Sequence, residues 1–137
     1  MSDRCWMAVH VRKDQFDRFM EVTQGAIQPS YGDTPEEEGN ALLIEDGEVN
    51  YGAYGQLCAA AEAGLTFIAR HGAGDEYGPR TIVGIGGIHH DVGVDNDSYP
   101  VVRCSKGGPD EDDVRAVKAF LAAEEAAEKE LGIHKEG

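Results

Sequence analysis

The spacing of apolar residues alternates along this chain between the period of a β-strand and that of an α-helix, and this constrains the fold most. In residues 5–11 the apolar side chains alternate, so Met7 and Val9 point to the same side of a strand. Phe16 and Phe19 are instead spaced as on one face of a helix. The order of such segments predicts an α+β domain. We expect a mostly antiparallel sheet of about five to seven strands, with two or three helices packed on one face.

Local signals give the expected boundaries of these elements. Asp14 is expected to cap the first helix, and Asp46-Gly47 to form the type I′ turn of a hairpin, in which both central residues need positive φ. Residues 28–40 are rich in turn formers and predict a long loop with at most one helical turn. The other expected strands are 41–45, 48–54, 65–70 and two or more within 80–104, turning near 86–87 and 95–97, and the other expected helices are 55–63 and 109–132.

The last helix has the clearest pattern. Pro109 stands at its start, and the carboxylates of 110–113 fill its first turn, where they meet the positive end of the helix dipole. That position explains this acidic cluster without a partner. The stripe expected to be buried consists of Val114, Val117 and Leu121, with Phe120 beside it.

Bulk composition is typical of one soluble globular domain, so we treat residues 1–137 as a single domain. No apolar run approaches the roughly 20 residues that cross a bilayer. No secretory signal is readable at the N-terminus, so the expected location is cytoplasmic. Cys5, Cys58 and Cys104 are odd in number and far apart, which predicts free thiols and no disulfide framework or structural zinc site.

Acidic residues are concentrated in one part of the sequence. The formal net charge is −14, and between Arg18 and Arg70 there are nine carboxylates and no lysine, arginine or histidine. A block of one sign attracts cations and basic surfaces, and it repels nucleic acid and anionic membranes. The composition therefore excludes direct nucleic-acid binding through a basic patch and argues against a membrane partner.

We interpret the acidic block as the partner-binding surface of a small non-enzymatic protein that needs no cofactor. Spaced carboxylates can imitate the phosphates of nucleic acid and fill a basic groove on a larger protein. Phage-encoded inhibitors of restriction or CRISPR complexes act in this general way and are the nearest analogy in size and charge. Nearby tyrosines suit such contacts because they combine an apolar ring with a polar tip. The expected partner-binding residues are Asp33, Glu36, Glu37, Glu38, Glu45, Asp46, Glu48, Tyr31 and Tyr51.

A competing explanation makes the acidity a background property. Abundant alanine and glycine, with more arginine than lysine, are expected of a GC-rich genome or a mildly salt-adapted host. The chain would then be an acidic structural or accessory protein of a phage or bacterial particle.

A small metal-dependent enzyme is the enzymatic alternative. Imidazole and carboxylate together suit zinc, manganese or iron(II). In a strand His89 and Asp91 point to the same side, whereas His90 points to the other. His89 and Asp91 are therefore the candidate ligands, with His71 or Glu76 approaching from the preceding loop.

Other common sites are not supported. The glycines of 84–87 precede a strand pattern with no lysine, so they do not open a helix that could cradle phosphate, and they are expected to mark bulges or close backbone approach. No Gly-x-Ser-x-Gly motif occurs, and Cys104 has a nearby cation but no identifiable base.

Overall fold

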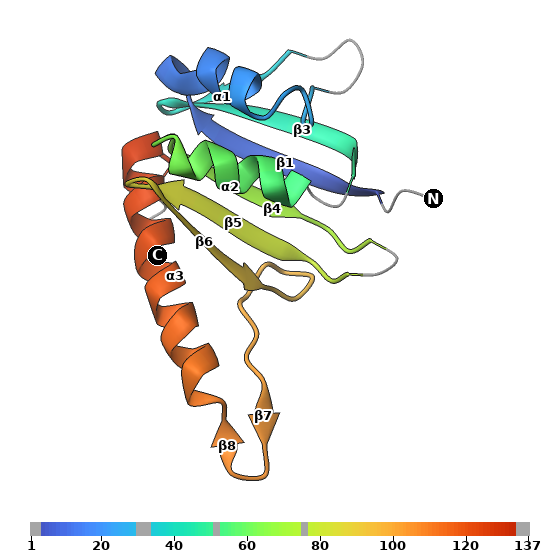
Figure 1. Cartoon of the computed structure of the whole chain (residues 1–137), viewed down its shortest axis with the longest axis vertical. Coiled ribbons are helices and arrows are strands. Elements are labelled where there is room, and N and C mark those ends of the chain that lie inside the picture. The colour runs from blue at the N-terminus through green and yellow to red at the C-terminus, as the bar shows by residue number, and fades with distance from the viewer. Residues whose placement is uncertain (1–3, 30–33, 51–52, 75–76, 134–137) are drawn as a thin grey trace.

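The computed structural model describes residues 4–29, 34–50, 53–74 and 77–133. They form a six-stranded antiparallel sheet in the order β2-β3-β1-β4-β5-β6 (Figure 1). The strands are β1 (Arg4–Arg12), β2 (Glu36–Glu38), β3 (Ala41–Asn50), β4 (Phe67–His71), β5 (Arg80–Ile85) and β6 (Ile88–Gly93), with a separate pair of β7 (Cys104–Ser105) and β8 (Gly108–Pro109). The helices are α1 (Phe16–Val22), α2 (Tyr54–Glu62) and α3 (Glu111–Leu131), and a 3-10 turn, η1 (Lys13–Gln15), precedes α1. The predicted α+β class is confirmed.

The sheet buries apolar residues on both of its faces. On β4, Phe67 and Ala69 belong to the core shared with α1 and α2, whereas Ile68 between them belongs to the core shared with α3. All three are fully buried. Two helices therefore share one face, here called the α1/α2 face, and α3 covers the opposite one, the α3 face. We expected helices on one face only. The inner strands are apolar at successive positions, so both faces of the sheet need cover, and α3 provides it on the second face.

Helix α3 is seated on the sheet by a different stripe from the one predicted. Phe120 is 2% exposed, whereas Leu121 is 44% exposed, and Val114 and Val117 are only partly buried. The buried positions follow helical spacing at Phe120, Ala123, Ala127 and Leu131. Sequence reasoning gave weight to the largest side chains, but alanines let the helix approach the sheet closely.

The C-terminal end of α3 is fixed to the turn between β2 and β3. The backbone N–H of Asn40 donates to the carbonyl of Leu131 at 2.8 Å. Gly132 ends the helix with φ of 71°, as the left-handed position after a helix requires. Gly39, also at positive φ, lies so close to the backbone of Gly132 that a Cβ there would collide with it. Both glycines are therefore needed for this contact.

The prediction of a hairpin turn at Asp46-Gly47 is wrong. Strand β3 runs through it, and its partners on β1 shift from Val49 opposite Cys5 to Asp46 opposite Met7, which leaves one extra residue as a β-bulge. Gly47 also lacks the positive φ of a type I′ turn. The continuous strand is favoured over the hairpin because it can pair along β1, which is 9 residues long.

Two other local expectations fail near the N-terminus. Residues 36–38, expected in a loop, form the edge strand β2 and pair with 41–43 of β3. Asp14 does not cap the first helix; Gln15 occupies the cap position, and Asp14 accepts a hydrogen bond from Arg12 Nε at 2.5 Å. The nearby arginine competes successfully for this carboxylate.

The glycine-rich segment behaves as its sequence predicts. Gly86 and Gly87 form the turn between β5 and β6 with φ of 63° and 82°. Gly84 lies under the ring of Phe67, where a Cβ would overlap the aromatic carbons. The segment is thus a hairpin with one close contact, and no helix follows it.

Gly84→Ala is expected to destabilise the fold by about 1–3 kcal/mol, because the added methyl group must displace the buried ring of Phe67. Urea denaturation measures this change in the free energy of unfolding. Gly55→Ala is the matched control: its Cβ meets nothing within 4 Å and it lies in α2, so about 0.5–1 kcal/mol of stabilisation is expected. Equal effects of the two substitutions would contradict the close contact.

Candidate functional site

The predicted acidic surface lies at the β2–β3 edge of the sheet. Residues 36–38 are exposed on β2, and Glu45 is exposed on β3. Asp46 is partly buried at the bulge, and its carboxylate accepts a hydrogen bond from the backbone of Gln28 at 3.0 Å. Glu48 belongs to β3, while Tyr31, Asp33 and Tyr51 lie outside the described residues.

Folding brings two basic side chains to this acidic block that the sequence does not show. His10 Nε2 lies 2.9 Å from Glu38 Oε2, and Lys13 Nζ lies 3.4 Å from Glu37 Oε2. His10 lies on β1, the strand next to β3, and Lys13 lies in the η1 turn directly after β1. Charged side chains on an edge strand also prevent edge-to-edge association, so part of this acidity has a structural explanation.

Helix α3 leaves part of its face of the sheet uncovered. It meets β1 and β3 near one end of each strand, where Glu130 accepts from Arg12 Nη1 at 2.6 Å and Ala41 joins the α3 core. Farther along β1, Trp6 is 50% exposed. A large aromatic side chain therefore lies exposed on the part of this sheet face that α3 does not cover.

Strand register places acidic and apolar side chains together on this uncovered area. Glu36, Leu43 and His10 lie in one row across β2, β3 and β1, and Glu45 lies beside Ala8 two residues along. Residues two apart in a strand share a face. We define the open sheet face as Trp6, Ala8 and His10 of β1, Leu43 and Glu45 of β3, and Glu36 and Glu38 of β2.

Strand alternation puts Trp6 on the opposite side of β1 from Met7 and Val9, but the sequence reasoning gave it no role. The signal that points to it is a bulky aromatic residue at a polar-side position of an alternating strand.

On the other face, His89 and Asp91 come together as the sequence predicts. His89 Nε2 lies 3.7 Å from Asp91 Oδ2. The carboxylate is already engaged: Arg80 donates to it from Nε at 2.8 Å and from Nη2, and the Tyr54 hydroxyl donates at 3.0 Å. The ring of His89 also meets Tyr54 edge-on at 6.2 Å. A metal ion would have to compete with an arginine for this carboxylate.

His71 is not brought to the same carboxylate. It lies at the end of β4, where it pairs with Arg80 of β5. Asp91 of β6 pairs instead with Ile82, two residues farther along β5. Within the described part of the chain, no group of three or more histidine, cysteine, aspartate or glutamate side chains could hold a metal ion. Glu76, the other ligand considered, is outside that part. The metal hypothesis thus keeps two of its ligands together and stays a prediction.

Burial shifts the pKa of three groups here. Partial burial and the carboxylate of Asp91 raise the pKa of Tyr54 to about 12, so its hydroxyl remains a donor at neutral pH. Burial, aided by the charge of Arg80 and opposed by a hydrogen bond to backbone, lowers the pKa of His71 below its usual value. Burial raises the pKa of Cys58, one helical turn after Tyr54, so this cysteine is a thiol and a poor nucleophile.

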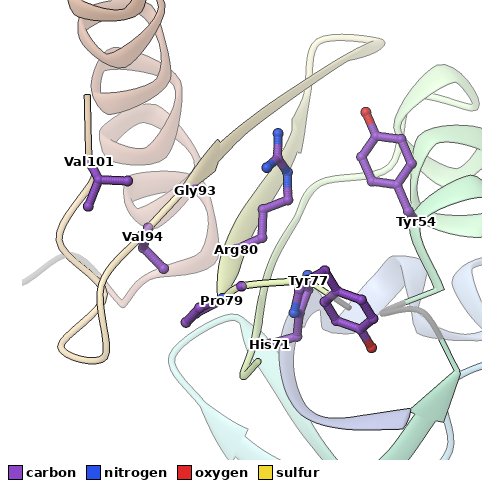
Figure 2. Close-up of a pocket in the computed structure, with 9 residues that line it drawn as sticks. Tyr54, His71, Tyr77, Pro79, Arg80, Gly93, Val94 and Val101 are labelled. Atoms are coloured by element: carbon purple, nitrogen blue, oxygen red, sulfur yellow. The ribbon is translucent and has the colours of Figure 1, made fainter. Parts of the chain in front are cut away.

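A pocket of about 530 Å³ opens beside this network on the α1/α2 face (Figure 2). Its walls come from the start of α2, the ends of β4, β5 and β6, and the loop segments next to them. Sequence reasoning named His71 as a candidate metal ligand but did not bring these residues together, because they come from segments far apart in the chain. The lining residues are Tyr54, His71, Tyr77, Gly78, Pro79, Arg80, Gly93, Val94 and Val101.

Comparison of the chain with family models, curated proteins and solved structures finds no significant match. Among the described residues, no helix is both long enough and apolar enough to cross a bilayer. Functional inference therefore depends on the two surfaces described above.

Spectrophotometric titration at alkaline pH tests the setting of Tyr54. Subtracting the tyrosinate absorbance of Tyr54→Phe from that of the wild type should give a transition with a midpoint near pH 12. Because the folded pKa lies above the ordinary tyrosine pKa of 10.0, the protonated phenol stabilises the fold below pH 10, and this contribution is lost as the pH rises toward 12.

Tyr99→Phe is the matched control, since Tyr99 is 69% exposed and its removal also deletes one tyrosine. A difference transition for Tyr54 centred near the ordinary tyrosine pKa of 10.0 would contradict the hydrogen bond to Asp91.

Proposed function

We propose that this chain is a small acidic binding protein that docks the open sheet face onto a basic surface of a larger protein. The observation that supports this most is the half-exposed Trp6 on an uncovered sheet face that also carries glutamates. An exposed aromatic residue surrounded by polar groups is typical of an interface centre with a polar rim.

Charge favours a basic partner over any other. With a net charge of −14, the chain repels polyanions and attracts cationic surfaces at long range. Glu36, Glu38 and Glu45 add local complementarity beside the aromatic anchor. His10 offsets the charge of Glu38 only when its imidazole is protonated.

The partner we favour is a nucleic-acid-binding protein whose basic groove the glutamates enter. Glu36 and Glu38 are two residues apart on β2, about 7 Å along the strand. Successive charges on one strand of DNA rise by about 3.4 Å along the helix axis, so the two glutamates are spaced on the same length scale as neighbouring backbone charges. Phage-encoded inhibitors of defence complexes remain the class-level analogy for such a role.

Affinity capture from nuclease-treated lysate of the source cells, analysed by mass spectrometry, tests this function. The tagged wild type should recover one stoichiometric basic protein at low salt and lose it as salt screens the charges. Added duplex DNA should displace that protein, because the two would share one groove.

The triple variant Glu36→Gln, Glu38→Gln, Glu45→Gln is expected to weaken this binding at least about tenfold, since each glutamate contributes local charge to the interface. Trp6→Ala should weaken it by a similar factor, as expected of a central aromatic residue. Both dissociation constants are measured with the purified partner by titration calorimetry.

A second triple variant, Glu21→Gln, Glu62→Gln, Glu125→Gln, is the control. It changes the net charge by the same amount at exposed positions on α1, α2 and α3, outside the open sheet face. Equal losses in both triple variants would mean that total charge, and not this surface, determines binding. Unchanged affinity in the first triple variant would remove the open sheet face from the interface.

A further inference from the structure

Residues 99–121, here called the arm, project beyond β6 and the rest of the sheet (Figure 1). They comprise the segment before β7, the β7–β8 hairpin and the first half of α3. With 21 residues, α3 is about 32 Å long. Six strands side by side span only about 24 Å. The buried residues of the helix begin at Phe120, and in the range 99–119, which is described throughout, no residue is buried.

Hydrogen bonds hold the arm in one shape although it has no core. Arg103 donates from Nε and Nη2 to the two carboxylate oxygens of Asp113, each at 2.9 Å, and its backbone N–H donates to the same carboxylate. The backbone N–H of Asp110 donates to the carbonyl of Arg103 at 2.8 Å. These bonds join the hairpin to the start of α3. A surface that is ordered in advance has less entropy to lose on association.

Apolar side chains of the arm are exposed to solvent. Tyr99 and Val101 are each more than half exposed, and Leu121 is only partly covered. A groove of about 470 Å³ lies between the arm and β6, and Val92, Val101 and Val117 form part of its lining. Removal of apolar surface from water is favourable by about 25 cal/mol per Å². The arm therefore offers surface that a partner can bury.

The arm carries no net charge. Its four basic and four acidic residues cancel, so the net charge of −14 belongs entirely to the rest of the chain. A basic protein is attracted to that remainder more than to the arm, whereas a second copy of this chain is repelled least at the arm. Charge thus favours a second copy as the partner. The charged residues are Arg103, Lys106, Asp110, Glu111, Asp112, Asp113, Arg115 and Lys118.

One stripe of the arm helix is complementary to itself. It has the spacing of a single helix face and consists of Glu111, Val114, Lys118 and Leu121. Val114 is partly buried, and the other three are exposed. When two such helices pack antiparallel about a two-fold axis between Val114 and Arg115, Glu111 of each copy lies opposite Lys118 of the other. Both charged pairs are then of opposite sign, and the valines lie beside the axis.

We propose that the arm is the interface of a two-fold homodimer, in which the α3 helices of two copies pack antiparallel along this stripe. Leu121 of each copy then faces the β7–β8 hairpin of the other. An arm of about 23 residues matches the 20–30 residues that each partner contributes to a standard interface. The open sheet face lies toward the opposite edge of the sheet, so the proposal is independent of the proposed function. A dimer would present two such faces.

Sedimentation velocity of the full chain tests the dimer over roughly 1 μM to 1 mM, a range that covers weak interfaces. The wild type should change from monomer to dimer as its concentration rises. Leu121→Asp should stay monomeric throughout, because it places a charge in the apolar part of the interface. Lys118→Glu should raise the dimer dissociation constant at least about tenfold, because two pairs of like charges then face each other.

Reversal of the charge pair tests the antiparallel register. Glu111→Lys alone should weaken the dimer as Lys118→Glu does, whereas the double variant should regain an affinity close to that of the wild type. Arg18→Glu is the matched control. It changes the net charge by the same amount as Lys118→Glu at an exposed position on α1, outside the arm, and should dimerise like the wild type.

A wild type that is monomeric at every concentration overturns the proposal, as does a Leu121→Asp variant that dimerises like the wild type. Equal losses in Lys118→Glu and Arg18→Glu would also overturn it, since total charge would then determine association. A double variant that dimerises no better than the single variants contradicts the antiparallel packing. Circular dichroism and thermal unfolding confirm that each variant is folded.

Discussion

Pairing of β1 along both of its edges is the constraint on which the other features depend. It forms antiparallel ladders with β3 on one side and β4 on the other, and its alternate residues Met7, Val9 and Val11 are fully buried. A one-residue slip in either ladder would send these side chains to the opposite face. The same register that buries them places Trp6 and His10 on the α3 face, and it sets β4 so that His71 lies beside Arg80.

The two sites use electrostatics in different ways. On the open sheet face, exposed carboxylates act in water, where their field is long-ranged at low salt and screened at high salt. In the pocket, Asp91 compensates Arg80, and burial lowers the pKa of His71. A chain with a large net charge thus contains a pocket whose lining carries little uncompensated charge. The two faces can act separately because the packed sheet lies between them.

The sequence predicts the parts of this fold that local patterns determine. Alternation locates β1, and Gly86-Gly87 locates the hairpin of β5 and β6. The prediction fails at Asp46-Gly47. A local turn signal favours a hairpin there, but pairing with β1, which is distant in sequence, stabilises a continuous strand.

The candidate sites were predicted only in part, for the same reason. The pairing of His89 with Asp91 follows from strand alternation, but the attachment of Arg80 and Tyr54 to that carboxylate does not. The basic side chains near Glu37 and Glu38 come from β1 and the turn after it, so a segment without basic residues in sequence has basic neighbours in space. The pocket escaped notice because five or more segments contribute its walls.

Helix α3 follows every strand of the six-stranded sheet in the sequence, and this order has a consequence for synthesis on the ribosome. The sheet residues Ile68 and Val83 are buried by a helix of 21 residues that is translated after every strand of the sheet. Until that helix emerges, an apolar sheet face stays open to solvent, and nascent chains are prone to associate with one another. The anchoring of Leu131 to Asn40 then joins the last helix to a turn made early in translation. Closure of the α3 face is thereby tied to the translation of this helix.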